Sequence, residues 1–74
     1  MRSDWSERTK RFLKAELKRA DVTYEELARR LTELGMTETK ASVSNKISRG
    51  GFPASFFVAS MRSIGMKQLR IEDV

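Results

Sequence analysis

The chain has 74 residues, which is enough for one domain and too few for two. It contains neither cysteine nor histidine, which excludes disulfide bonds, thiolate zinc sites, cysteine nucleophiles and the usual general base. Lys and Arg outnumber Asp and Glu by 15 to 10, and the formal net charge of +5 favours polyanions as partners.

The positive charge is concentrated in two parts of the chain. Between Thr39 and Ile71 there are six basic residues and no acidic one. A segment without carboxylates suits a phosphate-facing surface, because a carboxylate would repel the nucleic-acid backbone. A second basic cluster spans residues 8–19, where Glu16 is the only acid. Charge alone leaves open a second interpretation, in which both clusters are solvated helix faces.

Hydrophobic spacing predicts an all-α domain with four helices. They are expected over residues 4–20, 23–34, 39–49 and 53–65. In the first helix, Asp4 is a candidate N-cap. Its expected core residues are Trp5, Phe12, Leu13, Leu17 and Ala20.

The second helix has the clearest local signal in the chain, the sequence Thr23-Tyr24-Glu25-Glu26. It predicts a capping box, in which the Thr23 hydroxyl accepts from the Glu26 amide and the Glu26 side chain reaches back to the cap. Gly35 is expected to end this helix in the left-handed conformation. The expected buried stripe consists of Leu27, Ala28, Leu31 and Leu34.

The third helix has little to bury. Val43 and Ile47 are its one convincing apolar pair, and its other side chains are small, amide or basic. Thr39 is its expected N-cap, and Gly50-Gly51 is its expected end. A helix of this composition adds little to a core, but it suits a surface that recognises another molecule.

Pro53 is expected to open the fourth helix, with Phe52 and Phe57 as a hydrophobic staple around its start. Its inner side is expected to hold Phe56, Val58, Ala59, Met61 and Ile64. Residues 67–72 alternate between polar and apolar and predict a short strand. A four-helix domain offers that strand no partner, so it either frays or pairs with its copy in a second subunit through Leu69 and Ile71.

The second helix, the turn and the third helix together have the arrangement of a helix-turn-helix unit. Residues 23–28 resemble the T-x-E-E-L-A opening of helix two in λ-repressor-like (Cro/repressor, XRE-type) transcription regulators. Residues 43–52, Val-Ser-Asn-Lys-Ile-Ser-Arg-Gly-Gly-Phe, resemble the L-S-N-K-L-N-R-G-x-F stretch of small bacterial and phage members. Ile64-Gly65-Met66 is similar to their closing segment. A short proteobacterial family known only as a domain of unknown function has the same pattern.

This resemblance implies a single four- to five-helix λ-repressor-like domain over residues 1–74, with a short C-terminal strand at a dimer interface. It implies a small transcriptional regulator that binds double-stranded DNA as a homodimer, with helix 39–49 in the major groove. The residues carried over as base readers are Lys40, Ala41, Ser44 and Asn45. The residues carried over as phosphate contacts are Thr23, Ser42, Lys46 and Arg49.

Each of these roles has a structural alternative. Thr23 is a helix cap with or without DNA. Ser44 and Asn45 are also ordinary residues for a solvated helix. Arg49 is equally suited to the carboxyl end of its own helix, where a cation is favoured.

The turn before Thr39 is longer than in the resembling regulators, which leaves a second function open. In that alternative the fold binds another regulator or a toxin and no longer reads DNA. An enzyme is rejected because so short a chain leaves little room for a pocket, and Gly50-Gly51 lacks the pattern of a phosphate-binding loop.

We expect no cofactor, no metal, no small-molecule ligand and no membrane partner. No apolar run approaches the ~18–20 residues that span a bilayer, and no signal-peptide core follows the N-terminus. The expected location is therefore the cytoplasm, with association to the nucleoid when the protein is bound to DNA.

Overall fold

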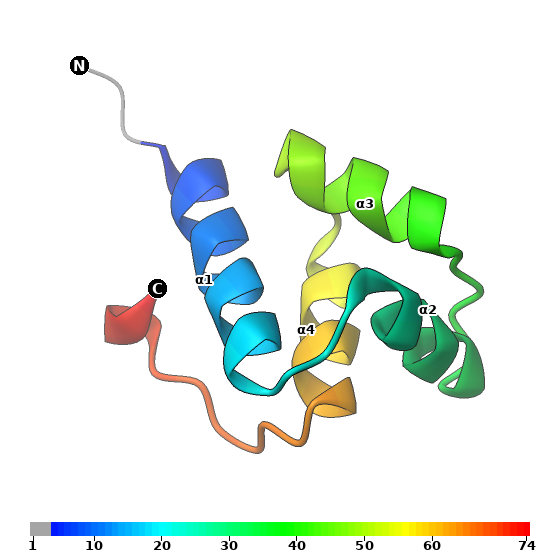
Figure 1. Cartoon of the computed structure of the whole chain (residues 1–74). Coiled ribbons are helices and arrows are strands. Elements are labelled where there is room, and N and C mark those ends of the chain that lie inside the picture. Colours follow the sequence, from blue (N-terminus) through cyan, green and yellow to red (C-terminus); the bar gives the residue numbers. More distant parts are fainter. Residues whose placement is uncertain (1–3) are drawn as a thin grey trace.

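A computed structural model describes residues 4–74, so residues 1–3 of the predicted domain lie outside the described residues. The helices are α1 (Trp5–Arg19), α2 (Tyr24–Glu33), α3 (Lys40–Arg49) and α4 (Ala54–Ser63), followed by the short 3-10 helix η1 (Ile71–Asp73) (Figure 1). The prediction of an all-α chain with four helices is confirmed. No helix within residues 4–74 is both long enough and apolar enough to cross a membrane.

Side-chain caps fix where the first three helices begin. The Asp4 side chain caps α1, and the Thr23 hydroxyl accepts a hydrogen bond from the Glu26 backbone N–H at 3.1 Å. At α3 the capping box is complete: the Ser42 N–H donates to the Thr39 hydroxyl at 3.1 Å, and the Thr39 N–H donates to the Ser42 hydroxyl at 2.8 Å. The three N-caps predicted from the sequence are therefore confirmed.

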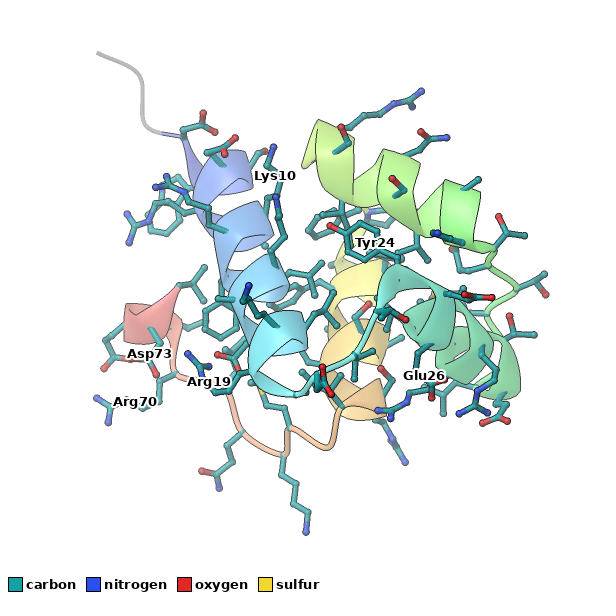
Figure 2. The ribbon with its side chains drawn as sticks, in the orientation of Figure 1. Lys10, Arg19, Tyr24, Glu26, Arg70 and Asp73 are labelled. Atoms are coloured by element: carbon teal, nitrogen blue, oxygen red, sulfur yellow. The ribbon has the colours of Figure 1, made fainter. Side chains whose placement is uncertain are left out.

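The predicted second half of the capping box at α2 is wrong. The Glu26 carboxylate does not return to the Thr23 amide, because it accepts hydrogen bonds from the guanidinium groups of Arg29 and Arg30, one turn further along the helix. Figure 2 shows Glu26 on α2, and both guanidinium groups lie within 3.1 Å of its carboxylate. In these hydrogen bonds both partners are charged, whereas in a hydrogen bond from the Thr23 amide only the carboxylate would be charged.

Two features join α3 to α4. Gly50 ends α3 in the left-handed conformation, with φ of +76°. Pro53 is the N-cap of α4, one position before the predicted place inside the helix. The predicted staple is present, since the rings of Phe52 and Phe57 are stacked with centroids 6.4 Å apart.

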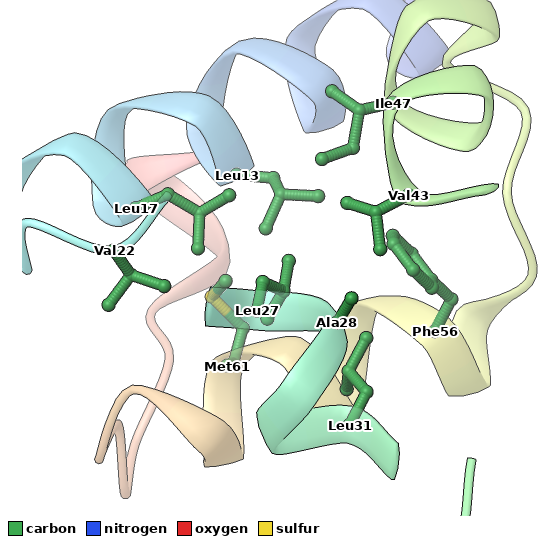
Figure 3. Packing of buried hydrophobic residues seen from close by; sticks show 10 residues of the cluster. All are labelled: Leu13, Leu17, Val22, Leu27, Ala28, Leu31, Val43, Ile47, Phe56 and Met61. Atoms are coloured by element: carbon green, nitrogen blue, oxygen red, sulfur yellow. The ribbon is translucent and has the colours of Figure 1, made fainter. Parts of the chain in front are cut away.

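The core lies where the four helices meet (Figure 3). It consists of Leu13, Leu17, Val22, Leu27, Ala28, Leu31, Val43, Ile47, Phe56 and Met61. Helix α2 packs against both α3 and α4, and α1 packs against the same two helices. Helix α3 enters the core through Val43 and Ile47, as the sequence predicted.

Four residues expected in the core are exposed instead. Trp5, in the first turn of α1, is 55% exposed, and the Arg8 guanidinium lies 4.1 Å from the centre of its ring. Val58 is 62% exposed because it lies on the opposite side of α4 from the buried Phe56. Ala20 and Leu34 are the C-cap residues of α1 and α2, past the turns that reach the core.

The predicted strand over residues 67–72 is wrong, and the described residues contain no strand. A strand requires a neighbouring backbone to pair with, and this part of the chain has none. The tail instead runs back beside α1 and closes in η1, where the Asp73 N–H donates to the Arg70 carbonyl at 3.0 Å (Figure 1). Leu69 is half-buried, whereas Ile71 is 70% exposed.

Candidate nucleic-acid interface

The two apolar residues of α3 determine which side of this helix faces outward. Val43 and Ile47 are buried, so the residues on the opposite side face solvent. The outward side chains are Ala41, Asn45, Ser48 and Arg49, all exposed, with the half-buried Ser44 at the edge. Lys40 is also exposed, but it lies in the first turn, three residues before Val43 and on the same side of the helix. The structure thus places the four predicted base-reading residues on one helix, with Ala41 and Asn45 on its outward face, Ser44 at the edge of that face and Lys40 exposed in the first turn.

The long turn between α2 and α3 is held in place by several contacts. Gly35 adopts a φ of +94°, which lets the Met36 N–H donate back to the Leu31 carbonyl at 2.9 Å. The hydroxyl of Thr32 lies 3.3 Å from the backbone nitrogen of Glu38, which donates to it. Met36 packs against the core. The extra length therefore forms an ordered connection that sets the position of α3.

Glu38 makes the contact that the sequence analysis missed. Its side chain is 5% exposed, and both carboxylate oxygens lie within 3.0 Å of the Lys46 ammonium nitrogen. The Ser42 hydroxyl donates to the same carboxylate. Glu38, Ser42 and Lys46 are spaced four residues apart in the sequence. This spacing could have predicted their contact, because residues four apart on a helix lie one above the other.

The contacts among Glu38, Ser42 and Lys46 give two of the predicted phosphate contacts a structural role instead. Lys46 is neutralised by Glu38, and its ammonium also lies 5.8 Å from the centre of the Phe56 ring. Ser42 uses its hydroxyl in the capping box and on Glu38. Both side chains hold α3 against the turn, on the flank of the helix and not on its outward face.

The other two predicted phosphate contacts are more accessible. Thr23 is exposed at the start of α2, where it acts as the cap, and Tyr24 beside it lies between α2 and α3 (Figure 2). Arg49 is exposed at the end of α3 and has no side-chain hydrogen bond or ion pair with any of residues 4–74. A surface hollow of about 350 Å³ lies between Arg49, Asn45 and the loop before α4.

The carboxyl end of α3 is supported by α1. The Lys10 ammonium donates to the Ser48 carbonyl at 3.3 Å, so Lys10 supplies the cation that the sequence analysis had offered as an alternative role for Arg49. Gly50 is buried here, and a Cβ at this position would lie 3.6 Å from the Ser6 carbonyl oxygen. Helix α1 therefore fixes one end of α3, and the Glu38 contact fixes its flank.

Both arginines of α2 are paired with carboxylates of the same helix. Hydrogen bonds from Arg29 and Arg30 lower the pKa of Glu26 to about 2, and Glu26 in turn raises the pKa of Arg29. Arg30 also donates to the Ser63 carbonyl at 3.0 Å, which ties α2 to the end of α4. Among residues 4–74, Lys40 on α3 has no such partner. The cations near this face that have no internal partner among residues 4–74 are therefore Lys40 and Arg49 of α3.

Comparison with known proteins gives a family without a function. A family model described as a domain of unknown function (DUF6471) matches residues 5–69. No curated protein matches the chain, and no solved structure matches it.

Proposed function

The chain belongs to the DUF6471 family, whose description assigns no activity, and we propose that it is a small DNA-binding transcriptional regulator. In this proposal α2, the ordered turn and α3 form a helix-turn-helix unit of the λ-repressor-like type, and α3 enters the major groove.

The outward face of α3 is the observation that supports this proposal most. It is polar and carries no carboxylate, and neither Asn45 on this face nor Lys40 in the first turn has an internal partner among residues 4–74. An α-helix with its side chains is about 10–12 Å across, which suits a major groove about 12 Å wide. An Asn amide pairs with adenine through two hydrogen bonds, Lys donates to guanine, and the Ala41 methyl suits the methyl group of thymine.

We assign the phosphate contacts to the two accessible candidates. Thr23 and the first amides of α2 form a helix N-terminus, where free N–H groups and the helix dipole favour an anion. Arg49, at the other end of the outward face, has a guanidinium without an internal partner among residues 4–74. Contacts of this kind hold α3 in register on the duplex and leave base selection to its face.

We propose further that the regulator is a homodimer, because one such module buries little surface on DNA. In this proposal the two subunits meet through an apolar contact and not through paired strands. An almost wholly apolar hollow of about 360 Å³ lies between the start of α1, the start of α4 and the tail, with the exposed Trp5 and Ile71 among its lining residues. A two-fold arrangement would place the two α3 helices one turn of duplex apart, about 34 Å.

Selection from a random duplex library at near-physiological salt tests the proposal as a whole. We expect enrichment of a two-fold symmetric sequence, and affinity for it should fall steeply between about 50 and 200 mM salt. A chain that gives no salt-dependent complex with any duplex would favour the alternative, a helix-turn-helix fold that binds another protein.

Asn45→Ala is the single substitution that tests base reading most directly. It should cost about 1–3 kcal/mol on the selected sequence and relax the preference at one base position. Arg49→Ala is the matched change for a phosphate contact, and it should weaken all sequences alike while reducing the salt slope by about 1. An equal loss on every sequence from Asn45→Ala would contradict base reading by this residue.

A further inference from the structure

A second cationic surface lies on the far side of the molecule from α3. It is an open groove of about 890 Å³ between the outer side of α1 and the tail of residues 66–74. We call it the arginine groove, after the four arginines that line it: Arg8, Arg11, Arg19 and Arg70. In Figure 2, Arg19, Arg70 and Asp73 lie on this side, with α1 between them and α3.

The groove keeps a positive charge after its internal contacts are counted. Glu16 pairs with Arg19, Glu72 lies 3.5 Å from the Arg70 guanidinium, and Asp73 is the other acid in the lining, so four arginines face three acidic side chains. Arg8 donates to a main-chain oxygen of Val74 at 2.8 Å, which holds the tail against α1. Arg11 is exposed and has no side-chain hydrogen bond or ion pair with residues 4–74. Guanidinium groups bind carboxylates through two parallel hydrogen bonds, so this surface favours acidic ligands.

The floor of the groove is apolar and includes Phe12, Ala15, Met66 and Leu69. Phosphates alone would leave this floor uncovered, because it offers them no hydrogen-bond donor. A ligand that fits both parts carries apolar groups flanked by carboxylates. An amphipathic peptide with acidic residues beside its apolar stripe has that chemistry.

The shape of the groove also favours a peptide. It is open along α1 from Arg8 to Arg19, a rise of about 16 Å at ~1.5 Å per residue. Sites for small molecules enclose most of the ligand surface, and this surface does not. A span of that length matches about three turns of a helix lying along α1.

We propose that the arginine groove docks an acidic, amphipathic helical segment of a partner protein, on the side of the molecule away from α3. Figure 1 shows α1 between α3 and the tail that borders the groove, so a duplex seated on α3 is expected to leave the groove accessible. The two surfaces can therefore be occupied together. This inference does not depend on the proposed DNA binding.

The test uses the full chain and a fluorescein-labelled synthetic helix of roughly 12 residues, the length that spans the groove, with Leu on one face and Glu beside it. Anisotropy measures its binding to three proteins: the unchanged chain, Arg11→Glu and Lys14→Glu. Lys14 is an exposed residue of α1 that does not line the groove, so its variant makes the same charge change nearby. A labelled 20-base-pair duplex is titrated in parallel.

We expect Arg11→Glu to weaken peptide binding at least about tenfold and Lys14→Glu to weaken it less than about threefold. The same peptide with Gln in place of Glu should bind much more weakly, and Arg70→Glu, on the exposed tail, should repeat the effect of Arg11→Glu.

Four results would overturn the inference: no saturable peptide binding up to about 1 mM, equal binding of the Gln peptide, equal losses in the Arg11 and Lys14 variants, or a tenfold loss of duplex affinity in Arg11→Glu. The last would assign the groove to nucleic acid. Failure to bind any duplex would refute the proposed function and leave the peptide result standing.

Discussion

Glu38 is the residue on which the position of α3 depends most. Its carboxylate is nearly inaccessible to solvent, and Lys46 and Ser42 satisfy both of its oxygens. Burying a carboxylate is unfavourable unless partners replace the lost water. The same contact keeps the Lys46 ammonium from binding an external anion. Lys46 lies in the segment without acidic residues that begins at Thr39, and its partner Glu38 directly precedes that segment.

Replacing Lys46 tests whether its contact with Glu38 is structural. Lys46→Met keeps the length of the side chain but leaves the Glu38 carboxylate unpaired, and it should lower the free energy of unfolding by about 1–3 kcal/mol. Adding Glu38→Gln should recover much of that loss, because a neutral amide tolerates the buried position better.

Urea unfolding of the two single variants and the double variant gives the coupling energy between the residues. If Lys46→Met leaves stability unchanged and weakens every duplex equally, Lys46 is a phosphate contact, as the sequence alone predicted.

At the scale of the helices, α2 carries its own acid-sensitive contact. Hydrogen bonds from Arg29 and Arg30 lower the pKa of Glu26 from 4.5 to about 2. The unfolded chain therefore binds a proton at Glu26 at a higher pH than the folded chain does. The stabilisation from this contact is complete above about pH 4.5 and is lost as the pH falls toward about 2.

Glu26→Gln should remove this part of the pH dependence. The unfolding free energy of the variant is expected to be lower at neutral pH and to fall less steeply between pH 4.5 and 2. Glu25→Gln is the control, since Glu25 is exposed and has no ion pair with residues 4–74. Thermal unfolding followed by circular dichroism across this range makes the comparison, and parallel slopes for the unchanged chain and Glu26→Gln would contradict the expected role.

The helices themselves could be predicted because their signals are local. Thr23 and Thr39 precede apolar runs of helical spacing, and a cap acts within one turn of its own position. The outward face of α3 followed equally directly, because Val43 and Ile47 alone determine which side is buried. No long-range information was needed for either conclusion.

The contacts that the sequence analysis did not predict depend on where the turn and the helices lie in space. Glu38 meets Lys46 because the turn places it beneath α3, and Lys10 meets Ser48 because α1 crosses the end of that helix. Trp5 has apolar character but lies in the first turn of α1, where no other helix covers it. The strand prediction failed for a related reason, since alternation describes a side-chain pattern and does not supply a backbone partner.

The whole molecule presents two different surfaces on opposite sides of α1. The α3 side is polar, and its unpaired cations are spaced along one helix, whereas the arginine groove combines cations with an apolar floor. The apolar hollow beside Trp5 is a third surface, at the open end of the tail. DNA, a partner peptide and a second subunit can bind at the same time only if each leaves the other two surfaces accessible.

The hollow beside Trp5 gives a prediction about the assembly. Ile71 is 70% exposed, so a substitution there leaves the core intact. Burying one isoleucine contributes about 1.5–3 kcal/mol, and a two-fold dimer buries it twice. Ile71→Glu should therefore weaken dimerisation by a factor of a hundred or more.

Sedimentation equilibrium at about 50 μM, well above the dissociation constant of a useful dimer, compares the unchanged chain with Ile71→Glu. Val58→Glu is the matched control, because Val58 is equally apolar and 62% exposed but does not line this hollow. A monomeric unchanged chain would refute the dimer. A dimer broken by Val58→Glu and kept in Ile71→Glu would move the interface to the other side of α4, where a second hollow lies next to Val58.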